Sequence, residues 1–340
     1  MKDEDDLRIV IIYNYEDAIT RGKPQDLIAL QDTAQCAQAI NEALRARGYQ
    51  TRTIAVGNSL DEFEKELLPL PRQSTFLFNV CDGLNGVNLG AIKIVRLIEK
   101  LGFKHTGSPA DVISICINKK RTKEKLIRHG ISTPRFQVFY KPTGVVGLNF
   151  PVIVKPLNED GSIGIDLDSV VNDKASLFSR INYVIETYYQ PAIVEEFIAG
   201  REFAISMWGN HEIEVLPVYE DDYSRIPDPH QWLLTFEAKW LVDSPYYQNI
   251  TATCPAALDP TIEQRVIQTA KDTYRTIGLR DFGRVDLRLY DGIPYVIDVN
   301  ELPDLTPESG FPKTAGIAGY RYEDMAERIL DLALRREGWR

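Results

Sequence analysis

The residues best suited to chemistry lie on a predicted β-hairpin near the end of the chain. Residues Arg284–Leu289 and Tyr295–Asn300 read as two strands joined by a turn at Asp291-Gly292. Because side chains alternate along a strand, antiparallel pairing would gather three oxygen-bearing side chains on one face: Asp286, Asp298 and Asn300. Such oxygens suit Mg²⁺ carrying a nucleotide's phosphates. The alternative is a solvated polar face of an edge hairpin, which the pattern by itself slightly favours.

A second candidate element combines a lysine with a glycine-containing loop. Lys155 closes the apolar strand Val152–Lys155, so its ammonium group would stand at the end of that strand. The loop Glu159–Gly164 contains Gly161 and Gly164 and could turn backbone N–H groups towards phosphate oxygens. The loop is neither a Walker loop nor a GxGxxG turn. A surface lysine before an ordinary loop therefore explains the pattern about equally well.

Carboxylates and two further lysines complete the candidates. The predicted strand Ala192–Phe197 carries Glu195 and Glu196 on opposite faces, so one of them would point into a cleft and could accept hydrogen bonds from an adenine amine or a ribose hydroxyl. Lys119 and Lys239 could each be an ordinary solvated lysine. The second of these lies in a long irregular segment, Asp221–Tyr247, and this length suggests a lid or binding loop.

The elements that must position these residues alternate in type. In the first hundred residues, strands alternate with helices, which predicts a parallel, doubly wound sheet whose ligands bind beyond the carboxyl ends of its strands. The predicted strands are Arg8–Tyr13, Gln50–Val56, Ser74–Val80, Phe136–Phe139, Val152–Lys155 and Ala192–Phe197. The predicted helices are Leu30–Gly48, Ala91–Leu101, a lysine-rich helix containing Lys119, Lys174–Tyr188, Thr261–Ile277 and Tyr322–Arg336.

Composition narrows the function classes further. The 340 residues carry a formal charge of −10, which argues against a general nucleic-acid or anionic-membrane surface. The N-terminus lacks the order of a signal peptide, and no apolar run is long enough to span a membrane. The four cysteines are scattered without a CxxC pair, which predicts reduced thiols and a cytoplasmic protein.

Together these segments resemble the D-alanine–D-alanine ligase family of ATP-grasp enzymes. Matching motifs follow one another in family order from about Phe78 to the C-terminus: HTGS, NKKRTK, FPVIVKP, EDGSIG, VEEFIAGREF, FEAKW, CPAAL, FGRVDLRL, DVNELPDLTPES and FPKTAGIAG. One such element could arise by chance, whereas this many in order are highly specific. The resemblance implies an α/β ATP-grasp fold. It would contain a substrate domain at 1–107, a central subdomain at 108–196 and a C-terminal catalytic subdomain at 197–340.

The resemblance also implies a role for each matching residue. Lys119 and Lys155 would hold the α- and β-phosphates of ATP, with the Gly161-Ser162 loop folding over the triphosphate. Glu195, Glu196, Phe197, Ile198 and Glu202 match positions around the adenine and ribose. Lys239, Arg284 and Ser162 would be catalytic, the lysine reaching the γ-phosphate and the arginine steadying the tetrahedral intermediate. Asp286, Asp298 and Asn300 would ligate two Mg²⁺ ions, with Mn²⁺ as a substitute, while Asp304 and Ser309 would face the substrates.

Several positions depart from the family pattern. The stretch Ile12–Gln31 lacks the family's glycine-rich turn and the glutamate that binds the first amino acid. Asp304 stands where the family has a glycine, Gly161 replaces a serine, and Asp298 replaces a glutamate. We therefore expect ATP use to be retained better than specificity for D-alanine.

The resulting hypothesis is a carboxylate–amine ligase that forms an amide through an acyl phosphate on small amino-acid-like substrates. Either cell-wall dipeptide synthesis or a specialised ligase of secondary metabolism, such as one of mycosporine-like amino acid biosynthesis, would fit, and the departures favour the second. A catalytically silent nucleotide-binding protein and a scaffold protein are the alternatives from other classes. A homodimer is expected because family members commonly form dimers.

Overall fold

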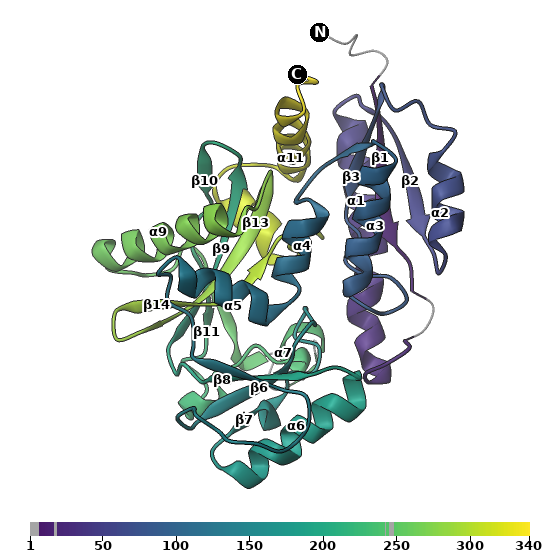
Figure 1. Ribbon diagram of the computed structural model, residues 1–340. Coiled ribbons are helices and arrows are strands. Elements are labelled where there is room, and N and C mark those ends of the chain that lie inside the picture. Colours follow the sequence, from purple (N-terminus) through teal and green to yellow (C-terminus); the bar gives the residue numbers. More distant parts are fainter. Residues whose placement is uncertain (1–6, 17–18, 242, 245–247) are drawn as a thin grey trace.

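The computed structural model describes residues 7–16, 19–241, 243–244 and 248–340, which form three sheets with flanking helices (Figure 1). The N-terminal sheet is parallel, in the order β2-β1-β3-β4. Its strands are β1 (Arg8–Asn14), β2 (Gln50–Val56), β3 (Thr75–Asn79) and β4 (Lys104–His105). The predicted doubly wound parallel sheet is thereby confirmed.

Alternation along β1 explains why helices cover both faces of this sheet. Ile9 and Ile11 pack against α1 (Leu27–Ala46) and α11 (Tyr322–Arg336), whereas Val10 and Ile12 pack against α2 (Leu60–Leu67) and α3 (Leu89–Lys100). A strand buried on both faces is a continuous apolar run, as residues 9–12 of this strand are. The C-terminal helix α11 thus completes the N-terminal domain, and the sequence pattern did not reveal this placement.

The central sheet is antiparallel and has the order β5-β8-β6-β7. Its strands are β5 (Phe136–Phe139), β6 (Val152–Pro156), β7 (Val170–Val171) and β8 (Ala192–Glu196), with a 3-10 turn η3 at Leu167–Ser169. The helix α6 (Lys174–Tyr188) packs on this sheet through Leu177, Ile181 and Val184. Asp173 caps that helix by accepting hydrogen bonds from the N–H groups of Ala175 and Ser176.

The C-terminal sheet is antiparallel and runs β12-β11-β9-β13-β14, with β10 paired to β9. Its strands are β9 (Arg201–Gly209), β10 (Ile213–Val215), β11 (Tyr219–Asp222), β12 (Thr251–Thr253), β13 (Phe282–Tyr290) and β14 (Ile293–Asn300). The helices α9 (Pro260–Ile277), α4 (Ala110–Cys116) and α5 (Lys119–Arg128) pack on one face. Residues 110–128 precede the central sheet in sequence but join the core of the C-terminal sheet.

Shorter elements lie in the connections between the longer ones. They are η2 (Pro24–Asp26), η4 (Pro229–Gln231), α7 (Phe236–Trp240) and α10 (Gly310–Ile317). The segment predicted to be irregular from Asp221 therefore contains two helical turns, while residues 242 and 245–247 lie outside the described part. In the described part, no helix is both long and apolar enough to cross a bilayer.

Candidate active site

The β13–β14 hairpin brings together the residues predicted to bind metal. Asp286 lies opposite Asp298, and Arg284 lies opposite Asn300, in the antiparallel register. Arg284 Nε and Nη2 donate to the two oxygens of Asp286 at 2.7 and 3.0 Å, and Asn300 Nδ2 donates to Asp286 Oδ2 at 2.9 Å. The alternate residues Val285 and Leu287 are buried in the core on the other face. The predicted division of the hairpin into an apolar and a polar face is confirmed.

Lys119 joins this polar face from the first residue of α5. Its Nζ donates to both oxygens of Asp298, at 2.9 and 3.1 Å, and lies 3.7 Å from Asp160 Oδ1 in the loop after β6. Burial by itself lowers the pKa of Lys119, but the charges of Asp298 and Asp160 outweigh burial and raise it above its ordinary value. The side chain therefore stays protonated, and its charge is available to an anionic ligand.

A second buried charge cluster lies at the end of β8. Glu195 is 1% exposed, and its Oε2 lies 3.3 Å from Lys155 Nζ and 3.2 Å from Lys123 Nζ. Its other oxygen, Oε1, is buried without a hydrogen-bond partner among the described residues. Glu196 turns to the opposite side, where it accepts from Arg135 and the N–H of Asn149, each at 2.9 Å. Of the two glutamates, Glu195 is therefore the inward one.

Lys123 was not singled out as a site residue on sequence grounds. It lies one helical turn after Lys119, so both project from the same face of α5. Its Nζ also donates to Thr133 Oγ1 at 2.9 Å. Burial lowers the pKa of Lys123 to about 8, with Glu195 opposing the shift. In the sequence, the i, i+4 spacing from Lys119 could have indicated that Lys123 belongs to the site. Its burial in the structure is what distinguishes it from a surface lysine.

The backbone of the glycine-containing loop has a conformation that lets a ligand approach it closely. Gly161 and Ser162 are consecutive left-handed residues, with φ of 62° and 61°. For Ser162 this conformation carries a steric penalty. Ser162 Oγ donates to the carbonyl of Leu234 at 2.8 Å, and Trp240 Nε1 donates to the carbonyl of Gly161 at 2.9 Å. The long segment after β11 thus holds the loop in place.

Glu202 is held by residues that the sequence patterns did not assign. Arg288 donates through Nε and Nη2 to Glu202 Oε2 at 3.0 and 2.5 Å, and Tyr223 donates its hydroxyl proton to the same oxygen at 3.0 Å. Arg288 Nη1 also donates to the carbonyl of Ile198 at 2.9 Å, and its guanidinium lies over the ring of Phe197. These bonds fix the positions of the residues predicted to surround a nucleoside.

One cavity of about 100 Å³ is lined by the predicted nucleotide and metal ligands together. These are Lys119, Lys155, Gly161, Ser162, Glu195, Glu196, Phe197, Ile198, Glu202, Lys239, Arg284, Asp286, Asp298 and Asn300. Asp304 and Ser309 lie outside it. Asp304 lines a second cavity of about 120 Å³ and, with Ser309, a third of about 510 Å³. The structure thus gathers the predicted nucleotide ligands in one cavity and places the two predicted substrate residues in neighbouring cavities that share Lys239 and Arg284 with it.

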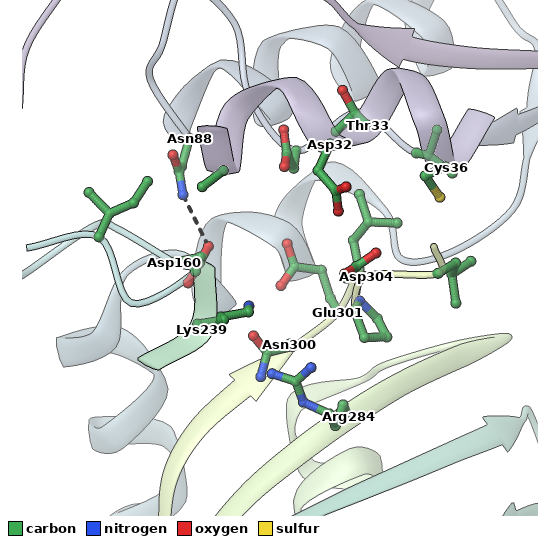
Figure 2. Close-up of a pocket in the computed structure, with 18 of the residues that line it drawn as sticks. Asp32, Thr33, Cys36, Asn88, Asp160, Lys239, Arg284, Asn300, Glu301 and Asp304 are labelled. Carbon is green, nitrogen blue, oxygen red and sulfur yellow. Dashed lines mark hydrogen bonds between the residues drawn. The ribbon is translucent and has the colours of Figure 1, made fainter. Parts of the chain in front are cut away.

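Lys239 and Arg284 line all three cavities. Lys239 lies on α7, with Nζ 5.0 Å from the ring centroid of Trp240, and it forms no ion pair with another described residue. Burial, and then the charge of Arg284, lower the pKa of Lys239. Figure 2 shows Lys239 and Arg284 pointing to the same space, between Asp160 and the loop that follows β14.

Comparison with known proteins agrees with this arrangement. Residues 126–331 match the family model described as D-ala D-ala ligase C-terminus. A D-alanine–D-alanine ligase of Cupriavidus taiwanensis is 31% identical over 247 residues, covering 71% of each chain. This chain belongs to the D-alanine–D-alanine ligase family, in its ATP-grasp fold.

Two further relatives also differ from this chain at most of the aligned positions. An uncharacterized protein of Sinorhizobium fredii is 35% identical over 79% of this chain and 77% of its own length. The D-alanine–D-alanine ligase of Bacillus anthracis, solved in complex with ATP, matches with a TM-score of 0.75 and 22% identity, covering 98% of this chain and 99% of its own. The predicted fold and the predicted enzyme class, an ATP-dependent carbon–nitrogen ligase, agree with these family members.

Within this family, the departures seen in the sequence have structural counterparts. Asp304 Oδ1 accepts from the N–H and the hydroxyl of Thr306, at 2.7 and 2.8 Å, so it shapes the loop after β14. Ser309 begins α10, and its hydroxyl donates within the same loop, to the carbonyls of Asp304 and Thr306. The unmatched N-terminal segment contacts the central domain, where Arg21 pairs with Glu159 and Gly22 N donates to the carbonyl of Thr187 at 2.9 Å.

Proposed function

We propose that this protein is an ATP-dependent ligase that joins a carboxylate to an amine through an acyl phosphate, acting on small amino-acid-like substrates. The observation that carries the proposal is the position of Lys239 and Arg284. They lie where the cavity with the nucleotide-ligand candidates meets two further cavities. Two cations at such a junction can serve both a transferring phosphoryl group and the acid that receives it. The ATP complex of the Bacillus anthracis relative supports ATP as the nucleotide.

The nucleotide would lie along the first cavity. Phe197 and Ile198 offer apolar contact to a base, and the unpartnered Oε1 of Glu195 is a ready acceptor for an exocyclic amine. Lys119 and Lys155 bring buried ammonium groups to the phosphates. The Gly161-Ser162 turn would cover the triphosphate with its backbone.

The metal candidates fit a magnesium-bound triphosphate. Asp286 and Asp298 face the same side, and each forms an ion pair, with Arg284 and Lys119 respectively. The two carboxylates thus already attract positive charge to this position. No three His, Cys, Asp or Glu residues of the described chain are arranged to hold a metal without help. Asp286, Asp298 and Asn300 would thus share two Mg²⁺ ions, or Mn²⁺, with phosphate oxygens. A bound Mg²⁺ would supply charge neutralisation at the transferring phosphoryl group.

The proposed reaction has two steps. A carboxylate oxygen of the first substrate attacks the γ-phosphorus, the bond to ADP breaks, and Lys239 and Arg284 stabilise the charge on the transferring group. The amine of the second substrate then attacks the acyl carbon. Inorganic phosphate leaves with the bonding electron pair, and the amine loses its proton as the amide forms.

Water must be excluded because it would hydrolyse the acyl phosphate. The contacts between the glycine-containing loop and the segment after β11 provide a cover. Trp240 and Ser162 join the two by hydrogen bonds, and Phe236 N donates to the carbonyl of Ile165 at 2.9 Å. A lid of two mutually bonded segments can close over both substrates.

The test is phosphate release from Mg²⁺-ATP against a panel of D- and L-amino acids, given singly and in pairs. Release that requires an added carboxylate and disappears in Asp286→Ala is the expected result. The matched control is Asp111→Ala, which removes an exposed carboxylate on α4 and should leave release unchanged. Release with D-alanine would place the protein in cell-wall synthesis, and release with another pair would indicate a specialised ligase.

ATP binding without release under any substrate pair would contradict the proposal. It would favour a protein that binds nucleotide without chemistry. A homodimer remains a prediction, which sedimentation of the purified full-length chain would test.

A further inference from the structure

Carboxylates dominate the second cavity, which has a volume of about 120 Å³ and lies between α1, the end of β3 and the loop after β14 (Figure 2). Five carboxylate side chains from different elements line it: Asp32, Asp82, Asp160, Glu301 and Asp304. The cations on the same wall are Lys239 and Arg284, and Arg284 is already bound by both oxygens of Asp286. The wall of this cavity therefore carries more carboxyl groups than cations, and burial raises the pKa of Asp82 to about 7 and that of Glu301 to about 8.

Several of these carboxylates lack a cationic partner. Glu301 is only 9% exposed, forms no ion pair within the described chain, and directs its carboxylate into the cavity in Figure 2. One oxygen of Asp82, Oδ1, is buried with no hydrogen-bond partner among the described residues. Asp32 on α1 likewise has no ion pair with a described residue. Buried carboxyl groups without a cationic partner either hold a proton or are stabilised by a ligand that brings positive charge to them.

Asp32 and Asp304 lie next to each other at the cavity mouth. Burial and then the charge of Asp304 raise the pKa of Asp32 to about 6. Both residues also line the 510 Å³ cavity, so the pair stands at the opening between the two spaces. In Figure 2 this pair lies on one side of the cavity and Asp160 on the other, with Glu301 between them. The anionic positions are thus spread along the cavity.

This spread suits an elongated organic cation better than a metal ion. A metal ion needs several ligands converging on one point, and among the described residues no three carboxylate, histidine or thiol side chains converge in that way. Two separated anionic positions match two separated positive groups. Lys239 and Arg284, in contrast, offer a place for one carboxylate beside the phosphoryl-transfer site.

We propose that this cavity binds, as the acid that becomes phosphorylated, an amino acid carrying a second cationic group, such as an ornithine-, lysine- or arginine-like compound, with Asp32 and Asp304 recognising the side-chain cation. The carboxylate of this substrate meets Lys239 and Arg284. Its α-ammonium group meets the Asp160 and Glu301 side of the cavity, and its longer arm reaches the mouth. This inference rests on the proposed ligase function, whose substrate class it specifies.

The experiment measures equilibrium binding of amino acids to the full-length protein saturated with Mg²⁺ and a non-hydrolysable ATP analogue. Ornithine, lysine and arginine, each as both enantiomers, are compared with norleucine, a neutral isostere of ornithine. The expected result is binding of at least one cationic amino acid about tenfold tighter than norleucine, since a charged hydrogen-bonded contact is worth at least that factor.

The variant Asp32→Asn keeps the side-chain shape and removes the charge. It should abolish the preference, so that the cationic amino acid and norleucine bind this variant with similar affinity. The matched control is Glu42→Gln, which removes an exposed carboxylate from the same helix and should retain the preference. Asp304→Asn should act like Asp32→Asn if it keeps the acceptor for Thr306.

Two results would overturn the inference. One is equal or tighter binding of norleucine, or a preference that survives in Asp32→Asn. The other is Mn²⁺ binding, measured without nucleotide or amino acid, that disappears in Asp32→Asn, because the carboxylates would then hold a metal. Phosphate release with a neutral amino acid alone would refute this inference and leave the ligase function standing. Selective binding of a cationic amino acid without any release would support the cavity assignment and refute the ligase function.

Discussion

Lys123 Nζ lies 3.2 Å from Glu195 Oε2, one helical turn after Lys119 on the same face of α5. Both partners are almost fully buried, and Lys155 contacts the same carboxylate oxygen at 3.3 Å. Two lysines therefore hold one oxygen of Glu195, while the other oxygen has no hydrogen-bond partner in the described part of the chain and faces the proposed adenine site. We infer that Lys123 positions Glu195 for base recognition.

Lys123→Met should weaken ATP binding and reduce the preference for ATP over GTP. Removing one partner of a buried charge pair costs about 3–5 kcal/mol when no other cation remains, and Lys155 should reduce this loss. Nucleotide binding and urea unfolding measure the two effects separately. Lys120→Met, on the exposed side of the same helix, is the control. Unchanged ATP-over-GTP preference in a folded Lys123→Met protein would show that Lys123 has only a structural role.

Arg284→Lys should lower the rate of phosphate release far more than it weakens ATP binding. Arginine binds both oxygens of Asp286, and a lysine cannot reproduce this planar contact. Losing one donor to developing negative charge typically costs about 10²–10³ in kcat. Steady-state kinetics together with ATP affinity give the separation, with the exposed Arg275→Lys as control. An equal loss in both quantities would mean that Arg284 acts in ground-state binding.

Trp240→Phe should loosen the proposed lid. It removes the 2.9 Å hydrogen bond to the carbonyl of Gly161, and one such bond contributes about 1 kcal/mol, or roughly fivefold in affinity. Ser162→Ala removes the second link, to the carbonyl of Leu234, and should have a similar effect. We expect KM for ATP to rise and carboxylate-independent ATP hydrolysis to increase. Tight coupling of hydrolysis to amide formation in both variants would argue against the lid.

The pH dependence of stability should change in Asp82→Asn. Burial raises the pKa of Asp82 to about 7 from an ordinary value near 3.8, so the folded protein binds a proton there that the unfolded chain releases. Between about pH 4 and pH 7 this group makes the free energy of unfolding fall as pH rises. The fall is about 1.4 kcal/mol for each pH unit between the two pKa values.

The variant removes this dependence. Asp82→Asn should therefore stabilise the protein relative to wild type more at pH 8 than at pH 5, as measured by urea unfolding at both values. Glu42→Gln, an exposed change, serves as the control. An equal effect at both pH values would show that Asp82 ionises normally in the folded protein.

Much of the fold followed from local patterns. The helix bounds Lys174–Tyr188 and Tyr322–Arg336 and the strand bounds Gln50–Val56 and Phe136–Phe139 were predicted as observed, because apolar periodicity and turn residues act over short distances. The lysine-rich helix containing Lys119 was predicted as one unit, but the structure has two helices there, α4 and α5. Asn118 interrupts it, adopting an extended conformation and capping the second helix.

By itself, the sequence determined the family and the oxygen-bearing residues of the hairpin. The register that places Asp286 opposite Asp298 depends on a bulge between Asp286 and Leu287, where Ile297 is skipped, because strict alternation from the turn would place Asp298 on the other face. Only the tertiary structure decided their counter-charges. Lys119 reaches Asp298 across 179 residues of chain, and Lys123 and Lys155 converge on Glu195 from different elements. It also decided that Asp32, from an N-terminal segment without a recognisable motif, lies next to Asp304 at the mouth of the substrate cavity. Such contacts depend on how helices and sheets pack, and packing is a property of the whole chain that no local pattern records.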